Sequence, residues 1–470
     1  MANRLIPPRI RATPNLVAHA GFWPARQAVV LSAILVLVLG SSSVGFALTF
    51  HAPPSPPPPP KASVVIGQTG FNSTAQGTER DQLGSPQFIA VDNSGNLWVS
   101  DYQNGWVTEY TPPFTNGESA ALEVGAANFS WSGCATGNAL CEPSGIAFDA
   151  SGNLWAGDTQ NASVQEFKAP FSIGEGSSVL LGGEYLGGTP TRTGFEPAGL
   201  AFDQSGNLWV ADGGSNRVLE FTPPFSAREA ASLVIGQPNF TTSSNNANQS
   251  MLSNPSSLAF DHSGNLWVAD TYDNRVLEFK TPFSNGESAS IAIGQPNLLS
   301  LAENTTQSTL NQPDGIAFDT HGNLWVVDTG NNRVAEFTPP FSTGMDASVI
   351  IGQDSYFYST AGVDQSSLYG PDSVAAGSGG NLWVADTGNY RVLLFVDPSS
   401  AATVSTTAEA SSAPQAQTSS AQATSSVGTT TEALSSSGQG VPEFPYQAAL
   451  VGIFTLVLAA SYVLARRRGF

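Results

Sequence analysis

One short stretch recurs six times in this chain and limits the folds that are open to it. It has the pattern Gly-Asn-Leu-Trp-x-x-Asp, and its copies begin at residues 95, 152, 206, 264, 322 and 380. Neighbouring copies are 54 to 58 residues apart. A fixed period of this length is typical of repeat architectures, in which each repeat is one supersecondary unit. We therefore expect a single repeated domain.

The fourth repeat illustrates the local structure that each copy predicts. Apolar or alternating runs at 258–260, 266–269 and 275–279 are separated by polar turns, and a fourth run follows at 290–295. Such runs suit short strands, and turns rich in Asn and Gly suit tight connections. Each repeat should fold into a four-stranded antiparallel sheet. One such sheet cannot bury both of its faces, whereas six around an axis can.

The fourth strands also predict how the ring closes. Six segments of this kind occur, but the first, at 64–68, precedes the first repeat and none follows the last. Residues 62–68 should complete the sixth blade and leave no open sheet edge. The expected fold class is all-β, a six-bladed β-propeller of four-stranded antiparallel blades closed by the N-terminal strand and flanked by membrane segments.

The fifth repeat carries the clearest family resemblance. Its segments 313–319 (Pro-Asp-Gly-Ile-Ala-Phe-Asp) and 322–334 (Gly-Asn-Leu-Trp-Val-Val-Asp-Thr-Gly-Asn-Asn-Arg-Val) resemble the NHL-repeat family of six-bladed propellers. The resemblance covers about residues 62–396. It implies the fold and leaves the activity open, because one fold hosts many functions.

The N-terminal end of the chain has the features of a membrane-targeting segment. A basic segment, 1–27, precedes the uncharged stretch 28–50, which we interpret as a signal peptide or a retained transmembrane helix. The proline-rich residues 51–61 predict a stiff spacer. Either interpretation of 28–50 leaves the propeller outside the cell.

The C-terminal end agrees with this topology. Residues 397–445 are rich in Ser, Thr, Ala and Gln and predict a disordered stalk. The apolar span 446–465 is long enough for a transmembrane helix, and the basic tail 466–470 favours a cytoplasmic end. The sequence Pro-Glu-Phe at 442–444, followed by this span and tail, resembles archaeal surface-sorting signals, which implies proteolytic processing; a plain membrane anchor is the alternative.

The charge of the chain argues against nucleic acid as a partner. The formal net charge is −20 at pH 7, and an acidic surface repels phosphates. We expect a propeller at the cell membrane or cell surface whose partner is an extracellular protein, a glycan or a cation, with membrane contact through the terminal helices.

Covalent features fit an exported protein. Cys134 and Cys141 are the only cysteines, and their spacing suggests a local disulfide. Some N-glycosylation is expected because six acceptor motifs are present. They lie at Asn72, Asn128, Asn161, Asn239, Asn248 and Asn304.

No catalytic arrangement is visible in the sequence. Of the four histidines, His262 and His321 lie in predicted turns and the others near the N-terminus, so a histidine base or a zinc site is disfavoured. An enzyme would need non-repeated carboxylates or histidines that meet at the axis, and the patterning singles out none. We therefore expect a non-enzyme without a metal or cofactor. The alternative is an extracellular lyase- or lactonase-type propeller with calcium in its channel.

Aspartates recur at the ends of the second strands, and in the last four repeats an arginine follows five residues later. We interpret these as structural pairs: Asp212 with Arg217, Asp270 with Arg275, Asp328 with Arg333, and Asp386 with Arg391. Trp106 and Ser163 replace the arginine in the first two repeats, so Asp101 and Asp158 lose that partner. This departure is either repeat drift or a binding sector.

Long loops connect each fourth strand to the next first strand, at 238–254, 296–312 and 354–370 among others. Loops of this length are usually functional or disordered. They share one face with the aspartate–arginine turns, which we call the long-loop face. Its exposed candidates are Phe240 and the run Tyr356, Phe357 and Tyr358. We expect a cell-surface binding module that uses this face; a surface-layer or adhesion component is the structural alternative.

Overall fold

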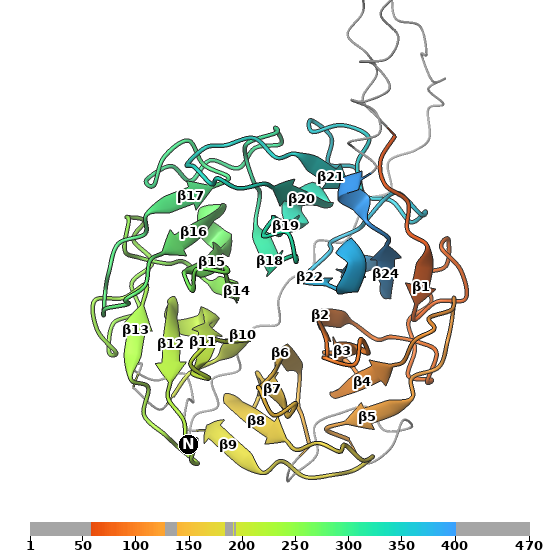
Figure 1. The fold of residues 1–470 in the computed structure, drawn as a ribbon, viewed down its shortest axis with the longest axis horizontal. Helices are drawn as coiled ribbons and strands as arrows, with labels where there is room; N and C mark the ends of the chain where they lie inside the picture. The colour runs from red at the N-terminus through yellow and green to blue at the C-terminus, as the bar shows by residue number, and fades with distance from the viewer. Residues whose placement is uncertain (1–57, 127–138, 184–190, 192–193, 401–470) are drawn as a thin grey trace, which may run out of the picture. The chain divides into compact units, whose positions relative to one another are not determined.

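The computed structural model describes residues 58–126, 139–183, 191 and 194–400. Within these residues, six four-stranded antiparallel sheets are arranged around a common axis (Figure 1). The expected six-bladed all-β propeller is confirmed. The described residues contain no helix with the length and apolarity needed to cross a bilayer. The two expected spans, the stalk and the Pro-Glu-Phe sequence lie outside the described residues.

Each blade consists of consecutive strands, apart from the sixth. Blade 1 contains β2 (Pro86–Val91), β3 (Leu97–Asp101), β4 (Trp106–Tyr110) and β5 (Leu122–Val124). Blade 2 contains β6 (Pro143–Phe148), β7 (Leu154–Asp158), β8 (Ser163–Phe167) and β9 (Val179–Gly182). Blade 3 contains β10 (Pro197–Phe202), β11 (Leu208–Asp212), β12 (Arg217–Phe221) and β13 (Leu233–Ile235).

The second half of the ring repeats this order. Blade 4 contains β14 (Pro255–Phe260), β15 (Leu266–Asp270), β16 (Arg275–Phe279) and β17 (Ile291–Ile293). Blade 5 contains β18 (Pro313–Phe318), β19 (Leu324–Asp328), β20 (Arg333–Phe337) and β21 (Val349–Ile351). Blade 6 contains β22 (Ser373–Ala376), β23 (Leu382–Asp386), β24 (Arg391–Phe395) and β1 (Val64–Ile66). The short 3-10 turns are η1 (Gly213–Ser215), η2 (Thr271–Asp273), η3 (Thr329–Asn331), η4 (Ser378–Gly380) and η5 (Thr387–Asn389).

Closure of the ring by the N-terminal strand is also confirmed. β1 pairs antiparallel with β24, with Val65 opposite Leu393, and the two ends of the coloured chain lie side by side in Figure 1. The Gln68 side chain extends the contact, because its amide donates to the carbonyl of Tyr390 at 3.0 Å. The last blade therefore depends on residues more than 300 positions apart in the sequence.

Aromatic side chains fill the interfaces between blades. Trp209 on β11 is fully buried and packs edge-on against Phe260 and Phe283 of the next blade, with ring centroids 5.7 and 4.9 Å apart. Its indole N–H donates to Asp203 at 3.1 Å, so the one polar atom of the ring is paired. Burial of such rings is a main source of stability in a fold of this kind.

The innermost strands are the first of each blade, and they position the site described below. These strands contact one another around the ring. Five of them begin with a proline, after which the register to the second strand shifts. Such a bulge releases one residue from regular pairing and redirects its side chain. The residue after each proline is therefore free to point toward the axis.

Candidate functional site

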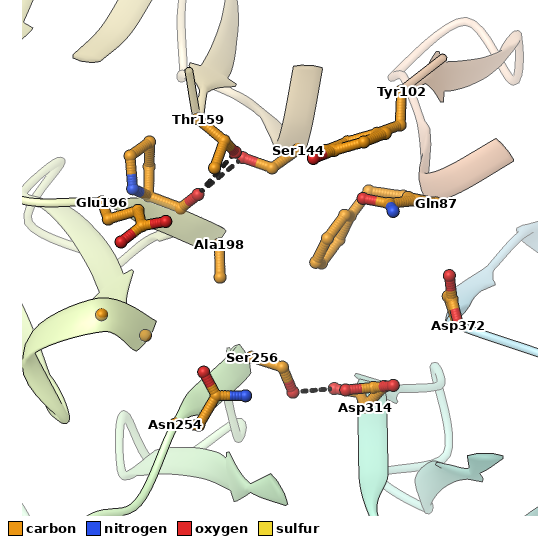
Figure 2. A pocket seen from close by; sticks show the side chains of 14 residues that line it. Gln87, Tyr102, Ser144, Thr159, Glu196, Ala198, Asn254, Ser256, Asp314 and Asp372 are labelled. Atoms are coloured by element: carbon orange, nitrogen blue, oxygen red, sulfur yellow. Dashed lines mark hydrogen bonds between the residues drawn. The ribbon is translucent and has the colours of Figure 1, made fainter. Parts of the chain in front are cut away.

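A cavity of about 260 Å³ lies at the propeller axis on the long-loop face. Its walls come from the starts of the first strands and from the turns that follow the second strands. The lining includes Phe88, Tyr102, Glu196, Gly213, Gly214 and Asn254, together with the residues that follow the first-strand prolines. Figure 2 shows these side chains around one shared space. We call this cavity the axial mouth.

The residue after the proline differs among the blades, although its neighbours repeat. These residues are, in blade order, Gln87, Ser144, Ala198, Ser256, Asp314 and Asp372, and all six line the axial mouth. The mouth is therefore asymmetric: blades 5 and 6 present carboxyl groups, whereas the other blades present amide, hydroxyl or methyl groups. A repeated scaffold thus carries a non-repeated set of polar groups.

Asp314 and Asp372 are half-buried and interact with each other electrostatically. Burial raises the pKa of Asp314 to about 6, while hydrogen bonds from nearby hydroxyl groups act in the opposite direction. Burial, together with the charge of Asp314, raises the pKa of Asp372 well above its ordinary value. Both carboxyl groups therefore hold a proton to a higher pH than an exposed aspartate does, and a protonated carboxyl group can donate a hydrogen bond.

This pair predicts a pH dependence of stability. The pKa of Asp314 rises from 3.8 to about 6 on folding, so the folded state binds more protons between these values. Its stabilising contribution is full below pH 3.8 and is lost as the pH rises through about 6. The unfolding free energy of the wild type should therefore decline between pH 4 and 7. We expect this decline, measured by urea denaturation, to be about 1–2 kcal/mol smaller in the Asp314→Asn/Asp372→Asn variant. Glu303→Gln, on an exposed loop, should keep the wild-type slope, and equal slopes in all three proteins would contradict the assignment.

Hydrogen bonds between blades stiffen the rim of the mouth. A threonine after the second strand donates to the carbonyl of the first-strand proline in the next blade in four places: Thr159 to Pro197 (3.1 Å), Thr271 to Pro313 (2.8 Å), Thr329 to Pro371 (2.7 Å) and Thr387 to Pro86. Tyr102 and Gly213 occupy this position in blades 1 and 3. Tyr102 instead donates to Glu142 at 2.7 Å. The rim therefore lacks the threonine hydrogen bond after the second strands of blades 1 and 3.

Glu196 brings a third carboxyl group to the mouth. Its backbone N–H donates to Asp212 at 2.9 Å, which fixes the start of β10. Its side chain lies over Gly214, where a Cβ atom would come within 2.3 Å of the Glu196 carboxylate. Gly214 is thus required for close approach, and a side chain at this position would displace Glu196.

The carboxyl groups of the mouth do not fit the calcium site of the alternative hypothesis. Within the described part of the chain, no three or more His, Cys, Asp or Glu side chains gather in an arrangement that could hold a metal ion. The charge of Asp314 raises the pKa of Asp372, which disfavours ionisation of both groups together.

The four repeated aspartate–arginine pairs lie away from this cavity. In each pair the arginine Nε lies 2.7 Å from an aspartate oxygen, and the side chains are almost fully buried. The guanidinium groups also donate to loop carbonyls; Arg333, for example, reaches Tyr356 at 2.7 Å and Thr306 at 2.8 Å. These contacts tie the long loops to the second and third strands.

Asp101 and Asp158 are held without an arginine. Asp101 accepts hydrogen bonds from the N–H groups of Gly84 and Ser85 and from the Asn104 amide, at 2.7 to 2.8 Å. Burial raises its pKa to about 6. Asp158 accepts from the Gln165 amide at 2.7 Å. Both carboxyl groups, like Trp106 and Ser163, are buried and do not line the mouth.

The aromatic candidates on the long loops divide into two groups. Phe240 and Tyr356 are half-buried against the hydrophobic core, and the Tyr356 hydroxyl donates to Ser348 at 3.0 Å. Phe357 and Tyr358 are exposed, at 68% and 58% of their surface. Only the latter two are placed to contact a large partner.

The covalent features are only partly visible. Cys141 is disulfide-bonded, and Cys134, the only other cysteine in the sequence, lies outside the described residues. Among the glycosylation motifs, Asn72, Asn239 and Asn304 are exposed. Asn248 is half-buried, the Asn161 amide donates to Asp158, and Asn128 is outside the described residues.

The expectation that no non-repeated carboxyl groups meet at the axis is wrong. The sequence pattern does not single out Asp314 and Asp372, because each follows a proline inside a segment that otherwise repeats from blade to blade. The residue type at this one position varies among the six aligned repeats, and that variation is the sequence feature that could have indicated the site. What the sequence could not reveal is the bulge that redirects this residue toward the axis.

Comparison with known proteins adds three observations. Residues 196–221, 310–337 and 368–395 match the NHL repeat. Peptidyl-alpha-hydroxyglycine alpha-amidating lyase 1 of Drosophila melanogaster is 26% identical over 156 residues, which cover 30% of this chain and 28% of the lyase. The match thus spans less than a third of that relative's length.

Solved structures with the same general architecture are more distant. A virginiamycin B lyase from Staphylococcus aureus has 13% identity, with coverage of 68% of this chain and 86% of that one and a TM-score of 0.37. A gluconolactonase from Xanthomonas campestris has 15% identity, with coverage of 74% and 98% and a TM-score of 0.43. Three stretches of the chain thus match the NHL repeat, and the described residues form a six-bladed β-propeller.

Proposed function

We propose that the protein is a binding module, displayed at the cell surface, that holds a small polar ligand in the axial mouth of its long-loop face. The proposal rests on the convergence of non-repeated polar side chains at the axis. The carboxyl pair, the Gln87 amide and the Ser144 and Ser256 hydroxyls all line this one cavity.

The lining favours a ligand that bears several hydroxyl groups, such as the terminal sugar unit of a glycan. The Asp314 and Asp372 carboxyl groups can accept hydrogen bonds, and each can donate one when it is protonated. Phe88 and Tyr102 of blade 1 add aromatic surface to the lining. A few convergent polar groups beside an apolar wall are typical of small-molecule sites, and about 260 Å³ is at the small end of their size range.

Titration of a panel of monosaccharides and simple polyols, followed by calorimetry and ligand-observed NMR, tests this proposal. We expect at least one member to bind, and Asp314→Asn to weaken its affinity about tenfold or more, because one hydrogen bond to a charged group contributes about 1.5–3 kcal/mol. Ala198→Phe should abolish binding by filling the mouth.

Glu303→Gln, which changes an exposed charge on the same face, should leave the affinity unchanged. Binding that survives Ala198→Phe would place the site elsewhere. Binding of proteins alone, through Phe357 and Tyr358, would support an interaction module of a different kind and overturn the axial proposal.

A second candidate is an enzyme that uses the same mouth. The carboxyl pair favours it, because two acids with different proton affinities can act as general acid and general base. The partial similarity to an amidating lyase points in the same direction. NMR spectra recorded over hours would separate the two functions: a bound ligand that stays unchanged supports the binding module, and conversion that Asp372→Asn abolishes supports the enzyme.

A further inference from the structure

Polar side chains are buried in the interface between blades 6 and 1, where the ring closes. Thr108 on β4 lies opposite Glu123 on β5, and Val99 on β3 continues this row across the sheet. Val99 packs with Ile66 of β1 and Leu394 of β24 in one hydrophobic cluster. The row that contains Glu123 therefore faces blade 6 and the closing strand.

The corresponding rows of blades 3 to 6 are entirely apolar. They consist of Val210, Leu219 and Val234; Val268, Leu277 and Ala292; Val326, Ala335 and Ile350; and Val384, Leu393 and Val65. Blade 2 has Ala156, Gln165 and Leu180. Tyr110 is a second departure, since phenylalanine ends the third strand of every other blade. A carboxyl group thus occurs in this row only at the interface that closes the ring.

The Glu123 carboxyl group and the Tyr110 hydroxyl are buried without direct hydrogen bonds to the described part of the chain. Glu123 and Tyr110 are 0% exposed. Within the described residues, neither Glu123 oxygen nor the Tyr110 hydroxyl has a hydrogen-bond partner. An ionised carboxylate in such surroundings is strongly disfavoured, so the closed ring favours the protonated form of Glu123. Burial raises its pKa to about 7, and the positive charge of Arg80 acts in the opposite direction.

The positive charge of Arg80 would attract an ionised Glu123 side chain out of the interface. Its guanidinium is exposed and bonds to the carbonyls of Ala120 and Ala121, directly before β5. The other charged groups near the cluster, which act on Tyr110, are Asp81, Asp101 and Glu118. All three are acidic and oppose a second negative charge in the interface. Movement toward Arg80 and solvent is therefore the favourable response to ionisation.

The closing strand is held by the loop that leads into β5. Val65 donates to the Asn116 side chain at 3.0 Å, and Gly117 donates to the Val65 carbonyl at 3.0 Å. A shift of Glu123 toward solvent would act directly on this loop. Gln87 of blade 1 and Asp372 of blade 6 lie on the two sides of this interface, and both line the axial mouth. A loosening of the interface would therefore also affect the mouth.

We propose that the interface between blades 6 and 1 is a proton-dependent latch. With Glu123 protonated, blade 1 packs against β1 and the ring is closed. With Glu123 ionised, the interface loosens and β1 detaches more readily. The latch does not depend on what the axial mouth binds.

Hydrogen exchange of the segment 62–68 in the full chain, corrected for the intrinsic effect of pH, tests the latch. We expect its protection to fall tenfold or more between pH 5 and 8. Glu123→Gln and Glu123→Leu should reduce this fall to that of segments in blades 3 and 4, the second by restoring the apolar row. Glu109→Gln, on the neighbouring strand with its carboxylate bonded to Asn96 at 2.8 Å, should behave as the wild type.

Segments of blades 3 and 4 serve as internal references in the same experiment. If their protection falls in parallel with that of 62–68, the opening is global and the latch is overturned. Constant wild-type protection of 62–68, or a fall that is as large in both Glu123 variants as in the wild type, would overturn it as well.

Discussion

Arg333→Ala should destabilise the protein by about 3–5 kcal/mol, because removing one partner of a buried ion pair leaves the other charge uncompensated. Arg333 is almost fully buried, with its Nε atom 2.7 Å from Asp328. Its guanidinium also holds Tyr356 and Thr306, so the loops on both sides of the blade lose their anchor. A decrease in Tm of roughly 5–10 °C is expected in a thermal melt followed by circular dichroism.

A matched control is Lys280→Ala. Lys280 is 63% exposed, and its amino group lies 4.0 Å from Glu278. Exposed pairs of this kind contribute about 0–1 kcal/mol, so the Tm should hardly change. Arg333→Lys should resemble the alanine variant, because a single ammonium group cannot replace the several directed bonds of the guanidinium. If Arg333→Ala and Lys280→Ala have equal Tm values, the repeated pairs are not structural anchors.

Removal of the closing strand should have a still larger effect. A chain that begins at residue 70 lacks β1, whose Val65 and Ile66 are fully buried, and it leaves one edge of β24 unpaired. Each lost apolar side chain costs about 1.5–3 kcal/mol. An exposed strand edge in addition promotes association between chains. We expect loss of the cooperative thermal transition and elution as large oligomers in size-exclusion chromatography.

A chain that begins at residue 61 keeps β1 and should behave as the full chain does in both measurements. Monomeric behaviour and an unchanged Tm in the shorter chain would contradict the role of β1 in closure. The two truncated chains differ only in residues 61–69, so the comparison isolates that segment.

The sequence predicted the fold well because the determining signals are local and repeated. The Gly-Asn-Leu-Trp turn, the alternating third strand and the early copy of the fourth strand each occur at a fixed spacing, and six copies reinforce one another. Val65 could be assigned to blade 6 by counting strands alone, and its pairing with Leu393 agrees. The structural role of buried arginines such as Arg333 could be inferred from the same repetition.

The candidate site was harder to predict because repetition hides it. Asp314 and Asp372 come from different blades, and only the closed ring brings them together. Asp314 follows the proline at which the pairing of β18 with β19 shifts register, and Asp372 directly precedes β22; propensity and periodicity encode neither placement. Glu123 could not be predicted for a related reason. A single polar residue in a short strand is common, and it becomes exceptional only when the strand pairing shows that the equivalent positions of other blades are apolar.

The redirected residue after each first-strand proline has a consequence for how such proteins diversify. These six positions line the axial mouth. Ser144 and Ser256 also donate to the next blade, at the carbonyls of Pro197 and Asp314, whereas the Ala198 side chain has no polar group. A substitution at Ala198 therefore exchanges a ligand contact without removing a hydrogen bond between blades, and a library that varies this position would sample new binding specificities at little cost in stability.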